Sequence, residues 1–131
     1  MSEAWTIPPD LDAMEAMARD VLARLPAQFQ TAIEGVPMVI AEFPDEEIVA
    51  DMELESPFDL LGLYQGVSLR DKTTNDLPSD PDMVFLYRRP ILDYWSETGE
   101  DIKNIVRHVL IHEIGHHLGL SDEDMEAIEA A

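Results

Sequence analysis

The fold of this chain is decided by one stretch near its C-terminal end, which reads HEIGHHLGLSD from His112 to Asp122. On an α-helix, four residues advance about one full turn, so the imidazoles of His112 and His116 leave the same face, one above the other. This spacing lets one rigid element offer two nitrogen ligands to a single metal ion. All four histidines of the chain lie between positions 108 and 117, which makes this helix the predicted functional centre.

The residues beside the histidine pair indicate a catalytic metal site rather than a structural one. Glu113 lies about 60° around the helix from His116, where its carboxylate can reach a water molecule on the metal without binding the metal. Gly119 can adopt the positive φ that ends a helix. The chain can then turn back and present Asp122 as a third ligand, which leaves a fourth position open for water.

A different role for Asp122 is also consistent with the sequence. Ser121 is a predicted cap of a final helix, with Asp124 at its third position, so Asp122 can stabilise the first turn of that helix without binding a metal. In that case Glu123 and Glu126 are the fallback ligands.

The whole pattern, His-Glu-x-x-His-x-x-Gly-x-x-Asp, is the extended zincin motif, and the chain resembles the minimal zincin family of small bacterial zinc metallopeptidases. The likeness is carried by VLIHEIGHHLGLSD at 109–122 and extends upstream to LGLYQGV at 61–67 and FLYRRPI at 85–91. The resemblance implies zinc-dependent hydrolysis of peptide bonds, with one Zn²⁺ per chain. Manganese, cobalt or nickel also suit nitrogen and carboxylate ligands, so the identity of the metal stays open.

In that chemistry, zinc held by His112, His116 and Asp122 lowers the pKa of its water and polarises the scissile carbonyl. Glu113 takes the proton of the water as general base and delivers it to the departing amine. His108 lies one turn before His112, where it either supports the site or lies at the surface. A donor for the developing oxyanion is also needed, and the sequence offers His117, Tyr64 and Tyr87.

Length and composition predict a single domain over residues 1–131, with a loose N-terminal arm at 1–9 and no room for a second lobe. The absence of cysteine excludes disulfides and thiolate ligands. The first residues lack the basic and apolar pattern of a signal peptide, and no apolar run approaches the length of a membrane span. We therefore expect a cytoplasmic protein.

The net charge is −20, from 28 acidic and 8 basic residues. A field of this sign repels phosphate backbones and anionic lipid, so we expect neither a nucleic-acid nor a membrane partner. It attracts divalent cations and basic or unfolded peptides, although it also serves simply to keep the protein soluble. The expected partner is a peptide or an unfolded protein substrate, bound by a monomer.

The first half of the sequence predicts helices and a strand against which the helix with His112 and His116 can pack. An N-terminal helix begins after Asp10 and stops at Pro26, with its apolar residues at helical spacing. The sequence then predicts a short helix at 27–34, a strand at 36–43 and a surface helix within the acidic stretch 45–55.

Two further strands complete an α+β fold, in which a small mixed β-sheet packs on the site helix and the N-terminal helix. Residues 60–67 predict a strand in which the glycines at 62 and 66 mark a bulge or a close backbone approach. By analogy with zincins, residues 60–65 are an exposed edge strand to which substrate adds as another strand; the alternative is an ordinary inner or edge strand that binds nothing. Residues 70–81 predict a loop at the rim of the cleft. The apolar run 83–88 predicts a central strand, followed by a helical turn at 91–95.

Three features of the second half carry further predictions. Thr98 and Asp101 form a capping box that predicts the start of the long site helix. Gly115 within that helix costs about 1 kcal/mol relative to alanine, which a close approach to a strand would explain. The pair Arg88 and Arg89 either binds a substrate carboxylate or joins the many acidic neighbours at the surface.

Two other functions share parts of the pattern. A small bacterial endoribonuclease family also places two histidines four residues apart on a helix, with a third ligand six residues on, where Asp122 stands here. That family has a histidine at this place and lacks the glutamate, so Glu113 and the negative charge oppose a nuclease. The other alternative is an adaptor that keeps the zincin scaffold and cleaves nothing, against which the intact Glu113 argues.

Overall fold

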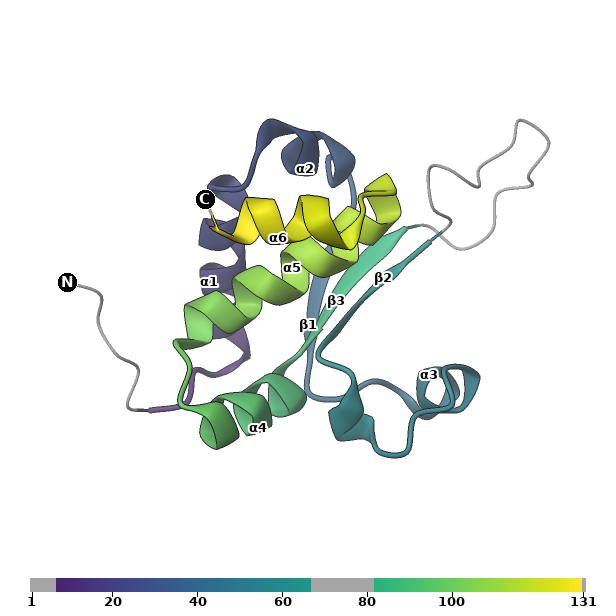
Figure 1. Cartoon of the computed structure of the whole chain (residues 1–131). Helices are drawn as coiled ribbons and strands as arrows, with labels where there is room; N and C mark the ends of the chain where they lie inside the picture. Colours follow the sequence, from purple (N-terminus) through teal and green to yellow (C-terminus); the bar gives the residue numbers. More distant parts are fainter. Residues whose placement is uncertain (1–6, 67–81, 131) are drawn as a thin grey trace.

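The computed structural model describes residues 7–66 and 82–130, so the predicted rim loop at 70–81 lies outside the described residues. Within that part of the chain, six α-helices, a 3₁₀ helix and three β-strands form (Figure 1). In chain order they are α1 (Leu11–Ala23), α2 (Ala27–Ala32), β1 (Met38–Ala41), α3 (Glu46–Asp51), η1 (Pro57–Asp59), β2 (Gly62–Gln65), β3 (Met83–Tyr87), α4 (Arg88–Thr98), α5 (Ile102–Leu118) and α6 (Asp122–Ala130).

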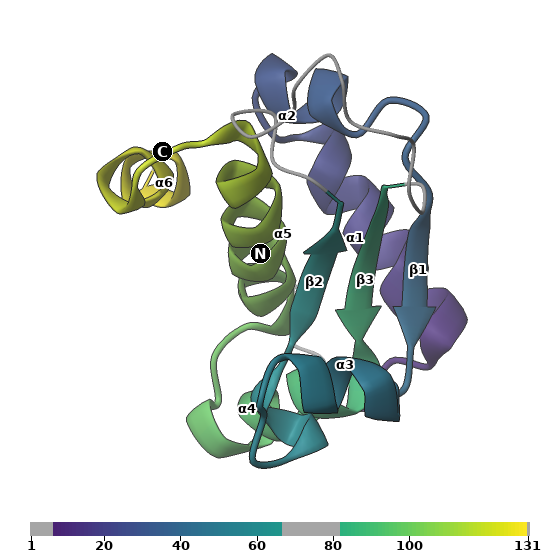
Figure 2. The ribbon, with the colours of Figure 1, turned by 90° about the vertical axis from the view of Figure 1, so that its right-hand side faces the viewer.

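The three strands form one mixed sheet in the order β1-β3-β2 (Figure 2). β1 runs parallel to β3, whereas β2 runs antiparallel to it, with Tyr64 opposite Val84. The predicted central strand is confirmed as β3, and the strand predicted within 60–67 is β2, which lies at an edge of the sheet. The predicted α+β fold with a small mixed sheet is therefore confirmed.

Two helices cover the sheet: α1 packs on β1, and α5 packs on β2. In Figure 2, α1 lies behind the sheet and α5 lies beside β2. Burial of apolar surface contributes about 25 cal/mol of free energy per Å², and it is the main interaction that holds these helices against the sheet. The core that they enclose includes Met14, Met17, Val21, Val84, Leu86, Ile105, Val106, Leu110 and Ile114.

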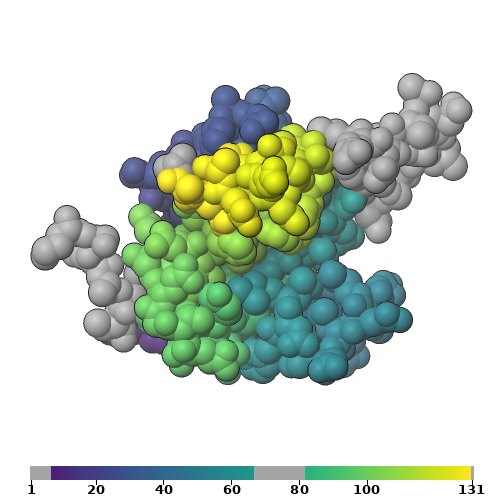
Figure 3. Space-filling view, in the orientation of Figure 1, coloured from purple at the N-terminus to yellow at the C-terminus, as the bar shows by residue number. Residues whose placement is uncertain are grey.

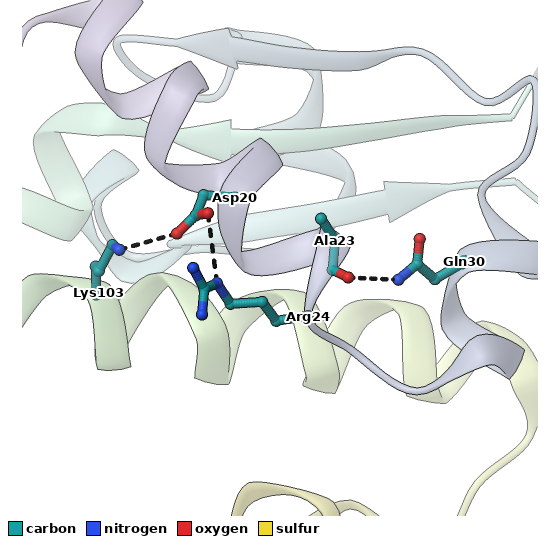
Figure 4. Close-up of polar contacts among 5 residues, drawn as sticks. All are labelled: Asp20, Ala23, Arg24, Gln30 and Lys103. Atoms are coloured by element: carbon teal, nitrogen blue, oxygen red, sulfur yellow. Dashed lines mark hydrogen bonds and ion pairs between the residues drawn. The ribbon is translucent and has the colours of Figure 1, made fainter.

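Polar contacts at the rim of this core fix α1 relative to α5 and α2. Lys103 Nζ on α5 donates to Asp20 on α1 over 2.9 Å, and Arg24 Nε approaches the same carboxylate at 3.4 Å (Figure 4). The hydrogen bond from Lys103 lowers the pKa of Asp20 below its usual value. Gln30 Nε2 donates to the Ala23 carbonyl over 2.8 Å, which ties α2 to the last residue of α1.

The beginning of α1 follows the prediction. Asp10 is its N-cap, since its Oδ1 accepts a hydrogen bond from Ala13 N over 2.8 Å. Just before it, Pro9 is buried, and its carbonyl accepts a hydrogen bond from Arg88 Nε over 2.8 Å. The end of the predicted arm is thus tied to the start of α4.

The two neighbouring arginines of α4 contact groups of this chain. Arg88 Nη1 donates to Glu42 over 3.0 Å, which is the surface pairing considered in the sequence analysis. The Arg89 guanidinium lies 5.9 Å from the centroid of the Phe43 ring. Both arginines lie on α4, whereas the metal ligands are predicted on α5 and after it.

The start of α5 differs from the prediction. Asp101 alone is its N-cap and accepts a hydrogen bond from Lys103 N over 2.9 Å. Thr98 is the last residue of α4, and its Oγ1 donates to the Tyr94 carbonyl over 2.9 Å. Gly99, with a left-handed φ of 68°, separates the two helices. The predicted capping box is wrong because Thr98 belongs to the preceding helix.

The helical turn predicted at 91–95 is part of a full helix. α4 has 11 residues and begins directly after β3, with Pro90 at its third position. Proline is tolerated in the first turn of a helix, because its missing N–H would have no intrahelical partner there.

Two glycines mark close approaches between elements. A Cβ on Gly62 would lie 2.4 Å from a methyl group of Val109 on α5 and 3.0 Å from the Phe85 carbonyl oxygen, so the predicted close approach is confirmed there. A Cβ on Gly115 would lie 2.5 Å from Met125 Sδ. The partner of Gly115 is therefore helix α6, and the prediction that a strand approaches it is wrong.

The junction between α5 and α6 follows the prediction. Gly119 has a φ of 80° and ends α5, while Leu120 N donates to the Gly115 carbonyl over 2.9 Å. Ser121 Oγ then accepts from Asp124 N over 3.1 Å, and Asp124 Oδ2 accepts from Ser121 N over 3.2 Å. Among the described residues, no helix combines the length and the apolar character needed to cross a membrane.

Candidate metal centre

The two predicted histidine ligands converge on one face of α5. The ring centroids of His112 and His116 lie 4.3 Å apart, with their planes inclined by 70°. One ligand atom from each, together with one from Glu113, all lie within 4.8 Å of one another. His112 and Glu113 are half-buried and His116 is exposed, so the cluster opens to solvent on one side. A group of ligand atoms this close together could hold a metal ion.

Glu113 is held by the edge of the sheet. Its Oε1 accepts a hydrogen bond from Tyr64 N over 3.0 Å, because that N–H points away from β3 at the free edge of β2. Burial raises the pKa of Glu113, and the Tyr64 N–H and the imidazoles of His116 and His112 offset this only in part. A fixed carboxylate with a raised pKa beside two predicted metal ligands is suited to accept a proton and to release it again.

Asp122 is the first residue of α6, and its side chain is exposed. Within the part of the chain that the structure describes, the group of side chains able to hold a metal consists of His112, Glu113 and His116. The Ser121–Asp124 capping contacts place Asp122 in the first turn of α6, where a carboxylate also favours the helix dipole. Ligation by Asp122 stays a prediction.

The wall beyond the cluster is built by two stacked rings. The rings of Tyr64 and His117 lie with centroids 4.0 Å apart and planes inclined by 13°, and both side chains are largely buried. Tyr64 Oη donates to Asp82 over 2.9 Å. Burial, with the Asp82 carboxylate, raises the pKa of Tyr64. The Tyr64 hydroxyl is therefore engaged with Asp82.

The third predicted oxyanion donor, Tyr87, is 1% exposed and lies in the interior. Burial raises the pKa of Tyr87 to about 12, with smaller contributions from Asp45 and Glu113. Tyr64 and His117 line a hollow of about 230 Å³ together with Glu113 and His116, whereas Tyr87 does not line it.

His108 has a partner that the sequence did not reveal. Its ring lies 5.6 Å from that of His112, and its Nδ1 contacts a carboxylate oxygen of Glu129 on α6. Arg107 fixes this end of α6, since it donates to the carbonyls of Glu129 and Ile128, each over 2.9 Å. Glu129 is 21 positions from His108, and no sequence signal connects the two.

A second hollow of about 470 Å³ lies on the other side of the cluster, with His112 and Glu113 in its wall. It is bounded by the start of β2, by α4 and by the first half of α5. Figure 3 shows the face on which α4 and α5, in green, meet the teal segment that contains β2, beneath α6 in yellow. The cluster of His112, Glu113 and His116 thus has a hollow on each side along β2.

One family of known proteins matches this chain. The sequence model of a family described as zincin-like metallopeptidase matches residues 33–131. That range includes all three strands, the helix α5 and the predicted ligands. A comparison with curated proteins finds no match.

Proposed function

Because the chain belongs to the zincin-like metallopeptidase family, we propose that it is a zinc-dependent peptidase whose substrates are peptides or unfolded proteins. The observation that carries this proposal is the cluster of His112, Glu113 and His116, in which one ligand atom of each side chain lies within 4.8 Å of the others and the carboxylate is anchored by Tyr64 N. His112 and His116 would hold the ion, with Asp122 as the proposed third ligand. Bound zinc supplies a Lewis acid for the scissile carbonyl and lowers the pKa of a water molecule.

Glu113 is the proposed general base. Its carboxylate would accept the proton of the attacking water and pass it to the departing amine. The hydrogen bond from Tyr64 N holds one oxygen in place, so the other oxygen is free to move the proton without a change of rotamer. The half-buried position lowers the dielectric constant around this transfer and strengthens each interaction.

The free edge of β2 is the proposed binding site for the peptide backbone. Tyr87 N donates to the Leu61 carbonyl over 2.9 Å, so Leu61 faces β3. In an antiparallel pair the peptide groups alternate in direction, so Gly62 and Tyr64 face the outer edge of the sheet. The Tyr64 N–H at this edge is bonded to Glu113, so a substrate would pair with Gly62 and with the Tyr64 carbonyl. A peptide that adds to this edge passes beside the metal cluster and both hollows.

The charge distribution is consistent with this substrate class. A net charge of −20 favours a dication and basic or unfolded peptides over nucleic acid. An adaptor without activity would have no need for a carboxylate fixed by the sheet edge, and Glu113 is fixed in this way.

The substitution Glu113→Gln tests the role of the base. Glutamine retains an oxygen that can accept the Tyr64 N–H, so the fold and the zinc content should stay unchanged, while peptide hydrolysis should fall by about 10²–10⁴-fold. The measurement is hydrolysis of casein or a peptide library, with zinc per chain determined by elemental analysis.

The matched control is Glu34→Gln, which removes an equal charge at an exposed position after α2 and should leave hydrolysis unchanged. If Glu113→Gln with full zinc cleaves peptides as fast as the parent, the proposed base is wrong. If the parent, fully loaded with zinc, cleaves no peptide of a broad library, the peptidase proposal fails in favour of a binding protein.

A further inference from the structure

We propose that the hollow between α4, α5 and the start of β2 selects a basic side chain, arginine or lysine, on the residue that follows the scissile bond. This inference rests on the peptidase function proposed above. It adds the class of substrate, which the family and the metal cluster do not specify.

The walls of this hollow suit a long side chain with an apolar stem. Its volume is about 470 Å³, and apolar groups of three elements form most of its lining. Among them, Ile105 and Val109 come from α5, and Leu60 and Leu61 precede β2. The methylene groups of arginine or lysine can pack along such a surface while the charged end stays hydrated.

The missing side chain of Gly62 shows which substrate residue enters the hollow. A Cβ on Gly62 would point at Val109 of α5, only 2.4 Å away, so this face of β2 is the one that borders the hollow. Residues opposite each other in an antiparallel pair direct their side chains to the same face. The substrate residue opposite Gly62 therefore directs its side chain into the hollow.

The direction of β2 orders the substrate residues. β2 runs from Gly62, beside the larger hollow, towards Tyr64, which lines the smaller hollow with His116. A peptide that pairs antiparallel, the slightly more stable arrangement, runs the opposite way. Since Glu113 borders both hollows, the scissile bond would be one of the two peptide bonds between the residues opposite Tyr64 and Gly62, and the proposal places it directly before the residue opposite Gly62.

The electrostatics of the hollow favour a positive charge. Glu100, in the exposed linker between α4 and α5, and the 42% exposed ring of Tyr94 both line it. A carboxylate attracts an ammonium or guanidinium group, and an aromatic face does the same through its quadrupole. His108 also lines the hollow, and its Nδ1 contacts the carboxylate of Glu129.

The basic residues of α5 do not oppose this selection. Lys103 is paired with Asp20 on α1, and Arg107 is bonded to the last carbonyls of α6. No lysine or arginine is among the described residues that line the hollow. The net charge of −20 adds a long-range attraction of the same sign.

Binding of three peptides to the zinc-loaded Glu113→Gln variant tests the proposal without requiring turnover. The peptides share a neutral, acetylated and amidated frame and differ at one central residue, which is arginine, norleucine or glutamate. Norleucine keeps an apolar stem without the charge. Fluorescence anisotropy should show the arginine peptide bound about five- to tenfold more tightly than the norleucine peptide, and the glutamate peptide most weakly.

A second substitution, Glu100→Lys, should abolish the preference for arginine or reverse it. The control Glu34→Lys changes the net charge equally at a position after α2 that does not line the hollow, so it should retain the preference. Both positions are exposed, so neither change disturbs the core. In the parent protein, mass spectrometry should place the cut directly before arginine.

Equal binding of the arginine and norleucine peptides would overturn the proposal, as would an arginine preference that survives Glu100→Lys or a cut directly after arginine. Absence of any peptide binding would overturn it too. These outcomes can be distinguished from a failure of the peptidase proposal. If the parent hydrolyses peptides without a preference for arginine, the peptidase proposal holds and the selectivity proposal fails. If the Glu113→Gln variant binds the arginine peptide selectively, Glu100→Lys abolishes that selectivity and the parent hydrolyses nothing, the selectivity proposal is supported and the peptidase proposal fails.

Discussion

The side chains in and near the cluster of His112, Glu113 and His116 differ in whether their polar groups have hydrogen-bonding partners. The Glu113 carboxylate accepts a backbone N–H of β2, and the Tyr64 hydroxyl donates to Asp82. The Tyr87 hydroxyl, in contrast, is buried without a hydrogen-bonding partner among the described residues. A buried polar group without a partner loses its hydration and gains nothing in return.

Tyr87→Phe should therefore stabilise the protein. Removal of the buried hydroxyl should raise the free energy of unfolding at neutral pH by about 1 kcal/mol, as measured by urea denaturation. Tyr94→Phe is the matched control, since Tyr94 is 42% exposed and its change should stay within about 0.5 kcal/mol. A loss of stability in Tyr87→Phe that the control does not show would mean that the hydroxyl has a favourable contact.

Tyr87 also makes the free energy of unfolding depend on pH. In the folded protein the pKa of Tyr87 is raised to about 12, above the value of about 10 in an unfolded chain. Because the folded protein holds this proton more tightly than the unfolded chain, ionisation of Tyr87 does not change the free energy of unfolding below about pH 10 and lowers it as the pH rises towards 12. Tyr87→Phe should show a smaller loss of stability across this interval than the parent.

The sequence was sufficient to predict that side chains of one helix lie close together, but it did not predict the contacts between different elements. The spacing of His112 and His116 fixes their common face through helix geometry alone. The bond from Tyr64 to Glu113 joins residues 49 positions apart, and the contact of His108 with Glu129 joins residues 21 apart. Such pairs depend on how α5 packs on β2 and α6, which no local pattern encodes.

At the level of elements, the ends of the helices decide where the functional groups lie. α5 ends at Gly119, whose positive φ redirects the chain so that Ser121 can cap α6. The sequence predicted this turn because glycine is strongly favoured in the left-handed conformation. It misplaced the start of α5, because α4 extends to Thr98 and leaves only Asp101 as the cap.

Gly119→Ala tests the turn between α5 and α6. At a φ of 80°, a Cβ clashes with the backbone, so the free energy of unfolding should fall by about 1–2 kcal/mol. Gly119→Asn is the matched control, since asparagine tolerates this conformation and should cost less. Urea denaturation of both variants provides the measurement; equal stability of Gly119→Ala and the parent would show that the turn is not a constraint.

At the level of the whole molecule, the sheet and the helices bring together groups that lie far apart in the sequence. The central place of β3 in the order β1-β3-β2 could be predicted from its apolar run, but the sequence did not show that β1 pairs parallel to β3 while β2 pairs antiparallel to it. That order leaves β2 at the edge, where α5 packs beside it. The fold therefore places an open strand edge and two imidazoles side by side.

The most direct test of this account is a zinc-edge anomalous difference map from a crystal of the zinc-loaded protein. The account predicts one peak per chain, within about 2.0–2.2 Å of a nitrogen of His112, a nitrogen of His116 and an oxygen of Asp122. A peak without Asp122 among its ligands would remove that residue from the site. No peak beside His112 and His116, under conditions in which zinc is in excess, would contradict the central claim.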